Sequence, residues 1–262
     1  RNLWWSTIFF SFFVLAVHGT AAFAQSSTAA QAEDAFFQGS NLLAKNELAG
    51  AVTALEKALK LDKDNVKYRQ VLAVAYNNYG LKLNREDQVT EGLRFIAKAA
   101  EVAPEDTDIR ANFVTAVMQM LKHPDGKVGL ADKIEFLQKV MQLEPENTSC
   151  RKSLAALMNN AAVIKGRKGD RGGEVADLEK AAELDPASVS IKRNLATAYY
   201  NLSVQKGKAE DFQEEVRLLK LARKLEPNDK SLVEALARVL SDMAVIKGQQ
   251  SDIPGQIALL KE

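Results

Sequence analysis

The sequence predicts an all-α fold, an α-solenoid built from tandem antiparallel helix hairpins. Three observations support this: a strict repeat, apolar residues at helical spacing within each repeat, and a low content of Gly and Pro. Gly (14) and Pro (6) together account for 20 of 262 residues, fewer than a turn-rich β fold or a disordered chain contains. With 47% hydrophobic and 26% charged residues, the chain has the composition of an ordinary folded protein.

The repeat is clearest where each unit ends. The segments KALKLDKDN, KAAEVAPED, KVMQLEPEN, KAAELDPAS and RKLEPND align without a gap. One column of this alignment, with steps of 41 residues, contains Lys63, Pro104, Pro145, Pro186 and Pro227. Pro suits a turn that needs no backbone donor. Four equal steps in succession indicate a repeat array.

Each unit is expected to contain two amphipathic helices. Apolar columns of the first helix are Tyr68, Ile109, Cys150, Ile191 and Leu232, then Leu72, Phe113, Leu154, Leu195 and Leu236. Those of the second helix are Leu93, Ile134, Val175, Val216 and Ile257, then Ile96, Leu137, Leu178, Leu219 and Leu260. Spacings of three and four place each set on one buried helix face. Because Gly and Asn tolerate the left-handed backbone that follows a helix, we expect the first helices to end at Asn84, Gly166, Gly207 and Gly248.

Residues 37–62, FQGSNLLAKNELAGAVTALEKALKLD, resemble a tetratricopeptide repeat (TPR). Gly39, Ala51 and Ala58 stand where that family places small helix-packing residues. Later units keep the family pattern at Leu195, Ala196, Tyr199, Ala222 and Pro227. The resemblance covers roughly residues 35–262 and implies a TPR-like superhelix whose first helices line a concave groove. The units depart from the family in having 41 residues instead of about 34. A HEAT-like array, which has a similar period, is the alternative.

The domain organisation predicted from these patterns has three parts. Residues 1–24 are expected to be a signal peptide, because the apolar run Leu3–Val17 precedes Ala22-Phe23-Ala24, an A-x-A cleavage pattern. Residues 25–34 are expected to be a flexible linker, and residues 35–262 the repeat array. Its units are 35–62, 66–103, 107–144, 148–185 and 189–226, followed by an incomplete unit from 230. Since the chain begins without Met and ends inside this unit, we expect a longer protein.

Composition argues against several classes of function. Lys and Arg number 35 and Asp and Glu 34, a net charge of +1, without the basic surplus of a nucleic-acid-binding protein. His18, His123 and Cys150 are the only His and Cys residues, too few for a His-based triad or a zinc site. We therefore expect a non-enzymatic protein with no metal, no cofactor and no nucleic-acid partner.

The Gly-rich stretch Gly166–Gly173 lacks the Gly-Lys-Ser/Thr of a phosphate-binding loop. We interpret it as a solvated turn between helices. The alternative is a local anion-binding patch, formed by Lys165, Arg167, Lys168 and Arg171.

One polar pattern on the first helices stands out as a candidate binding site. It is a stripe at i, i+3 and i+7, whose polar members are Asn78, Asn112, Thr115, Gln119, Ser153, Asn160, Asn194, Thr197, Asn201, Arg238 and Asp242. Asn is unfavourable inside a helix, so its recurrence calls for a reason. Primary amides both donate and accept hydrogen bonds, which suits contact with a peptide backbone. The alternative is a polar stripe that is solvated or hydrogen-bonded between helices.

The sequence therefore predicts a non-enzymatic, exported scaffold, periplasmic or secreted, that binds a protein or peptide partner in its concave groove. The alternative function is a helical accessory region of a larger exported enzyme or assembly whose other domain lies beyond residue 262. Membrane contact is expected only if residues 3–24 are retained as an anchor, since about 20 apolar residues span a bilayer.

Overall fold

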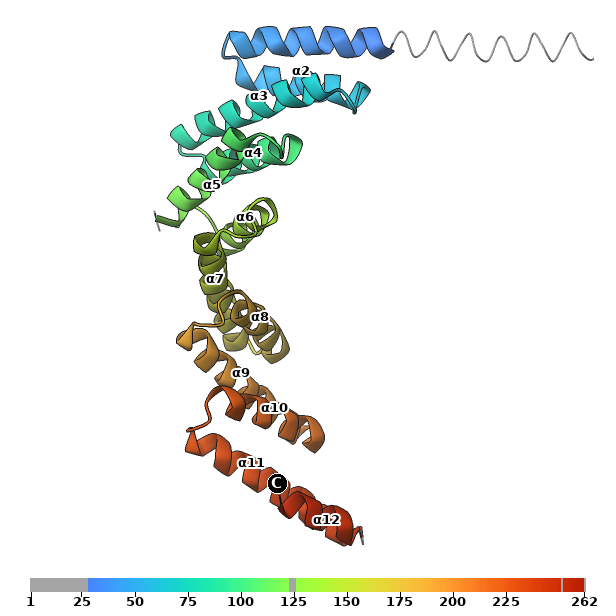
Figure 1. The fold of residues 1–262 in the computed structure, drawn as a ribbon, viewed down its shortest axis with the longest axis vertical. Coiled ribbons are helices and arrows are strands. Elements are labelled where there is room, and N and C mark those ends of the chain that lie inside the picture. Colours follow the sequence, from blue (N-terminus) through green and yellow to red (C-terminus); the bar gives the residue numbers. More distant parts are fainter. Residues whose placement is uncertain (1–27, 123–125, 251, 262) are drawn as a thin grey trace, which may run out of the picture. The chain divides into compact units, whose positions relative to one another are not determined.

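The computed structural model describes residues 28–122, 126–250 and 252–261, and within these ranges the regular structure is helical throughout. The helices follow one another as antiparallel hairpins (Figure 1). The predicted all-α fold of tandem hairpins is confirmed. The predicted signal peptide, residues 1–24, lies outside the described residues.

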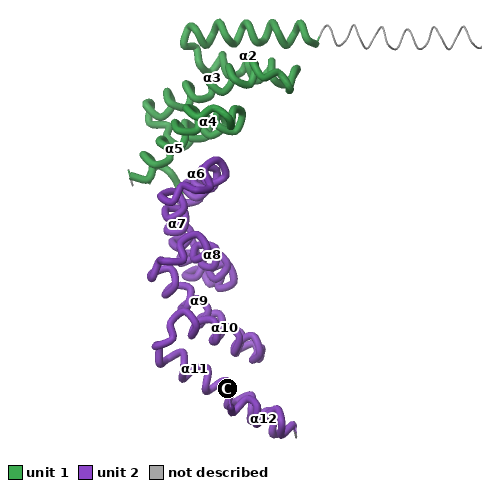
Figure 2. Tube along the Cα trace, in the orientation of Figure 1, with its two compact units in different colours: residues 1–129 green, residues 130–262 purple. Residues whose placement is uncertain are grey.

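The chain divides into two compact units, Arg1–Gly129 and Leu130–Glu262 (Figure 2). In the first unit a helix of residues 28–44 is followed by α2 (Leu48–Leu61), α3 (Val66–Arg85), α4 (Val89–Val102) and α5 (Thr107–Lys122). The second unit contains α6 (Leu130–Leu143), α7 (Thr148–Arg167), α8 (Arg171–Leu184), α9 (Val189–Lys208), α10 (Phe212–Leu225), α11 (Lys230–Gln249) and α12 (Ile253–Leu260).

The first hairpin begins earlier than the sequence predicted. Residues 28–34, assigned to a flexible linker, belong to the helix of residues 28–44. Ala32 is 1% exposed and Ala35 and Phe36 are also buried, and the Phe36 ring stacks on Tyr68 of α3 at 4.6 Å between centroids. The linker prediction is wrong for this stretch, because Ala32 continues the buried helix face of Ala35 and Phe36.

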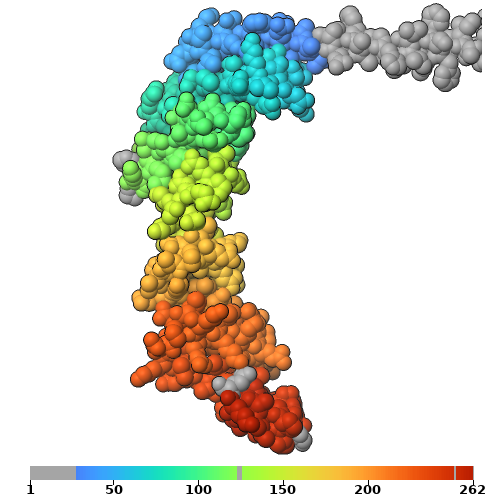
Figure 3. Space-filling view, viewed as in Figure 1, coloured from blue at the N-terminus to red at the C-terminus, as the bar shows by residue number. Residues whose placement is uncertain are grey.

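The predicted apolar columns form the core. Every member of the two first-helix columns is buried, from Tyr68 to Leu236. On the second helices, residues such as Leu93 and Leu178 are fully buried, and each of α4, α8 and α10 packs against the first helix that follows it. On α12 the same two columns are exposed, with Ile257 at 48% and Leu260 at 64%, because no described helix follows. Figure 3 shows α12 in red at the C-terminal end of the second unit.

The first helices α3, α5, α7, α9 and α11 begin at a repeated side-chain cap that the sequence analysis missed. Residues two positions after the Pro column accept a backbone N–H from the first turn, and they are Asn65, Asp106, Asn147, Ser188 and Asp229. Asn147 Oδ1, for example, accepts from Cys150 N at 3.1 Å and Asp106 Oδ1 from Ile109 N at 3.0 Å. A cap of this kind stabilises a helix by about 1 kcal/mol.

The expected ends of the first helices are wrong. Asn84, Gly166, Gly207 and Gly248 lie inside α3, α7, α9 and α11, and none has a positive φ. The left-handed residues come three positions later, at Asp87 (φ 68°), Gly169 (φ 90°) and Glu210 (φ 59°). The glycines instead provide room, because a Cβ on Gly166 would lie 2.2 Å from the carboxylate of Glu174 on α8.

Small residues also allow the two helices of a hairpin to cross closely. A Cβ on Gly39 would lie 2.6 Å from Leu55 Cγ, and one on Gly80 would lie 2.6 Å from Ile96 Cγ1 and 2.5 Å from the carbonyl oxygen of Gly92. The repeat places small residues in the same column, namely Gly39, Gly80, Ala162, Ser203 and Ala244. Leu121 is the exception, and it belongs to the repeat in which the two compact units divide.

Tyrosine–carboxylate hydrogen bonds join successive hairpins in both units. The Tyr76 hydroxyl of α3 donates to Glu56 Oε1 of α2 at 2.6 Å, and the Tyr199 hydroxyl of α9 donates to Glu179 Oε1 of α8 at 2.7 Å. Burial and then the bonded carboxylate raise the pKa of both hydroxyls well above the ordinary value of 10. Each tyrosine therefore remains a protonated donor across the usual pH range.

Candidate functional site

The candidate residues of the first unit lie on α3 and α5. Asn78, Asn112, Thr115 and Gln119 are exposed. Asn112 Nδ2 of α5 donates to Asn77 Oδ1 of α3 at 3.3 Å, and Asn77 Nδ2 donates in turn to Asn78 Oδ1 at 3.4 Å. Part of the stripe in this unit is thus hydrogen-bonded between helices, which is the alternative that the sequence left open.

The second unit repeats this relay of amides. Asn194 Nδ2 of α9 donates to Asn159 Oδ1 of α7 at 2.8 Å, and Asn159 Nδ2 reaches Asn160 Oδ1 at 3.5 Å. The acceptors Asn77 and Asn159 were missed by the sequence analysis. These two asparagines are 82 residues apart, which is two repeats. The same position of the other repeats is occupied by Met118 and Tyr200, so the 41-residue spacing does not show an asparagine column.

The remaining candidates are not gathered into one site. Ser153 on α7 is half-buried, while Arg238 and Asp242 on α11 are exposed. The last two lie near the buried Glu215 of α10. Burial raises the pKa of Glu215, and of the two neighbouring charges Arg238 lowers it and Asp242 raises it. Arg238 and Asp242 line none of the hollows found beside α9.

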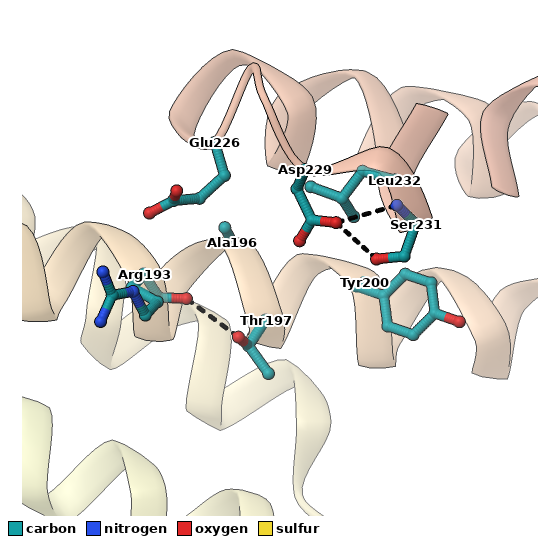
Figure 4. A pocket seen from close by; sticks show the side chains of 8 residues that line it. All are labelled: Arg193, Ala196, Thr197, Tyr200, Glu226, Asp229, Ser231 and Leu232. Carbon is teal, nitrogen blue, oxygen red and sulfur yellow. Dashed lines mark hydrogen bonds between the residues drawn. The ribbon is translucent and has the colours of Figure 1, made fainter. Parts of the chain in front are cut away.

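Two hollows of the described surface follow one face of α9. The first has a volume of about 320 Å³ and lies between α9 and the turn from α10 to α11. It is lined by Arg193, Ala196, Thr197, Tyr200, Glu226, Asp229, Ser231 and Leu232. In Figure 4, Glu226 and Asp229 lie across the hollow from Arg193 and Thr197.

Local hydrogen bonds fix the polar groups of this first hollow. Thr197 Oγ1 donates to the carbonyl oxygen of Arg193 at 3.0 Å. Asp229 Oδ1 accepts from the backbone N–H of Ser231 at 2.9 Å and from Ser231 Oγ at 2.6 Å. These bonds lower the pKa of Asp229, so its carboxylate stays charged at neutral pH.

The second hollow, of about 490 Å³, lies between α9 and the turn from α7 to α8. Its lining residues are Gly169, Arg171, Tyr200, Asn201, Val204, Gln205 and Lys208. Tyr200 lines both hollows. Together they form what we call the α9 groove, which follows the helix from Arg193 to Lys208.

The length of the α9 groove suits an extended peptide. At about 1.5 Å per residue, the helix from Arg193 to Lys208 rises about 22 Å. An extended strand rises about 3.3 Å per residue, so about seven residues match this length. Of the predicted site residues, Thr197 and Asn201 line the groove, whereas Asn194 faces its partner Asn159 on α7.

The Gly-rich turn contributes fewer free cations than its sequence suggested. Lys165 Nζ is 2.6 Å from Asp177 Oδ2, and Arg171 Nη1 is 2.9 Å from Glu174 Oε2. Two of the four residues of the alternative anion patch are therefore paired with acidic residues of α8.

Other kinds of site are absent from the described residues. These residues include no group of His, Cys, Asp or Glu that could hold a metal ion, and no helix long and apolar enough to cross a membrane. Cys150 is fully buried, and burial raises the pKa of its thiol, as expected for a core residue.

No model of a known protein family matches the sequence, and no curated protein matches it. Among solved structures, a TPR repeats protein from Bacteroides fragilis is 16% identical with a TM-score of 0.39, covering 79% of this chain and 97% of that one. The P58(IPK) TPR domain is 17% identical with a TM-score of 0.32, covering 87% and 71%. YrrB, a TPR protein with an unusual peptide-binding site, is 18% identical with a TM-score of 0.27, covering 82% and 96%. All three are described as TPR proteins.

Proposed function

We propose that this protein is a non-enzymatic scaffold that binds an extended polypeptide segment in the α9 groove. One observation carries the proposal: two hollows follow the same exposed face of α9 and share Tyr200. Aromatic side chains give large contact area at low entropic cost and are enriched where proteins bind partners. Asn201 adds an amide that can both donate to and accept from a peptide backbone.

The groove residue Asn201 differs from the paired amides of the relay. Asn194 already donates to Asn159, and its role is to join α9 to α7. Asn201 is half-buried and its amide bonds to no other side chain of the described structure. It is therefore available for a ligand without the loss of an internal bond.

The proposal is tested by selecting phage-displayed peptides of random sequence on immobilised residues 25–262. Bound peptides should lose affinity for the double variant Thr197→Ala/Asn201→Ala. Each lost hydrogen bond is worth about 0.5–1.5 kcal/mol, so the pair should weaken binding roughly tenfold or more. Asn41→Ala, on the exposed face of the helix of residues 28–44, is the control and should leave affinity unchanged. Equal affinity for wild type and the double variant would refute the α9 groove as the binding site.

We further propose that the protein is exported and that residues 1–24 are removed. The support is the apolar run before Ala22-Phe23-Ala24, which has the pattern of a cleaved signal peptide. Trp4 and Trp5 are the only tryptophans, so the mature form should lack tryptophan fluorescence. An extracytoplasmic form that retains this fluorescence would show that the segment stays attached.

A further inference from the structure

We propose that the α9 groove is electrically polarised, and that it selects a segment with an acidic residue at one end and a basic residue at the other. The inference rests on the proposed function and adds the chemistry of the bound segment. The two hollows differ in charge.

The hollow beside the α10–α11 turn is acidic overall. Its lining includes the carboxylates of Glu226 and Asp229 and a single cation, Arg193. Glu226 and Asp229 project from the side opposite α9 (Figure 4). No ion pair joins Arg193 to either carboxylate in the described structure, so one negative charge is left over for a basic side chain of a ligand.

The hollow beside the α7–α8 turn is basic. Arg171 and Lys208 line it, and no carboxylate does. Arg171 is bonded to the buried Glu174, which leaves Lys208 as the cation without an ion-pair partner among the described residues. Lys208 is the last residue of α9. This end of the groove is therefore suited to a carboxylate.

The spacing of the two ends defines the ligand. Arg193 and Lys208 mark the groove ends, about 22 Å apart along the helix, so the two opposite charges of an extended ligand should be about six or seven residues apart. Tyr200 lies between the hollows and favours an apolar or aromatic residue near the centre of the segment. Exposed charges of this kind act more on selectivity than on total affinity.

The inference is tested with a double charge reversal, Lys208→Glu/Glu226→Lys, which preserves the net charge of the protein. Neither side chain serves as a helix cap or bonds to another described side chain, so the variant should fold. Its matched control, Lys180→Glu/Glu183→Lys, makes the same exchange on the exposed face of α8. Circular dichroism of the three proteins establishes that their helix content is equal.

Phage-displayed random heptapeptides are then selected separately on wild type, reversal variant and control. Peptides selected on wild type and control should share one order of acidic and basic residues along the sequence. Peptides selected on the reversal variant should have the opposite order. A wild-type peptide should bind the reversal variant roughly three- to tenfold more weakly, with the difference shrinking at high salt.

The two remaining outcomes separate this inference from the proposed function. Peptides that require Thr197 and Asn201 but have no preferred polarity would overturn the polarised groove and leave the proposed function standing. Failure to recover any peptide above background from all three proteins would overturn both.

Discussion

Replacement of Gly80 by Ala tests how closely the helices of one hairpin approach. Gly80 lies within α3, where a Cβ would be 2.5 Å from the carbonyl oxygen of Gly92 and 2.9 Å from the backbone nitrogen of Ile96. Both are main-chain atoms of α4, so a rotamer change of a neighbour cannot relieve the clash. We expect α3 and α4 to separate slightly in this variant.

The magnitude follows from two opposing contributions. Ala is more favourable than Gly within a helix by about 0.5–1 kcal/mol, whereas an extra methyl group in a packed interior costs about 1–3 kcal/mol. Gly80→Ala should therefore destabilise its unit by up to about 2.5 kcal/mol. Gly172 is the matched control, because it lies in α8 and an added Cβ would meet no atom within 4 Å. Gly172→Ala should leave stability unchanged or raise it slightly.

Thermal unfolding followed by circular dichroism at 222 nm gives the sign of each change. Since repeat arrays unfold in parts, hydrogen exchange should also show faster opening of α3 and α4 in Gly80→Ala. Shifts of equal sign and size for Gly80→Ala and Gly172→Ala would contradict the close helix crossing.

Three further predictions concern Glu215, the column of Leu219, and the two asparagines Asn194 and Asn201. Burial raises the pKa of Glu215 in the folded state, so ionisation of this side chain opposes folding. Glu215→Gln should therefore raise the free energy of unfolding at neutral pH. In urea titrations the gain should vanish below about pH 4.5, the ordinary pKa of Glu, where the carboxyl is protonated in both states. Leu219 and Leu260 share a column, but because only Leu219 is buried, Leu219→Ala should cost about 2–5 kcal/mol and Leu260→Ala should leave the melting temperature nearly unchanged. Asn194→Ala should lower the melting temperature by breaking the bond to α7, whereas Asn201→Ala should leave it equal or higher, because Ala is the better helix former; similar shifts for both would contradict the division into relay and groove residues.

Periodicity was enough to predict which residues form the core. Phe113 and Leu178 were assigned to buried columns and both are fully buried, because a buried helix face leaves apolar residues at spacings of three and four. The same reasoning did not predict that Ile257 is exposed. An apolar column shows that a position is suited to burial, but burial also requires a neighbouring helix.

Pair interactions were harder to predict. Gly166 was interpreted from its own backbone freedom, whereas its role depends on Glu174 opposite it in the hairpin. The relay from Asn194 to Asn159 joins residues that are 35 positions apart, a spacing that no single column reveals. The groove itself depends on turns that bring Asp229 and Arg171 beside α9, which a pattern along one helix does not contain.

Site-specific photocross-linking tests the central claim, that the α9 groove holds an extended peptide, most directly. A benzoylphenylalanine placed at Gln205, which lines the groove, is compared with one at Lys180 on the exposed face of α8, each irradiated with the same library-selected peptide. If the α9 groove holds the peptide, an adduct forms at position 205, an excess of unlabelled peptide abolishes it, and no adduct forms at position 180. An adduct of equal yield at both positions, or one at position 180 alone, would contradict it.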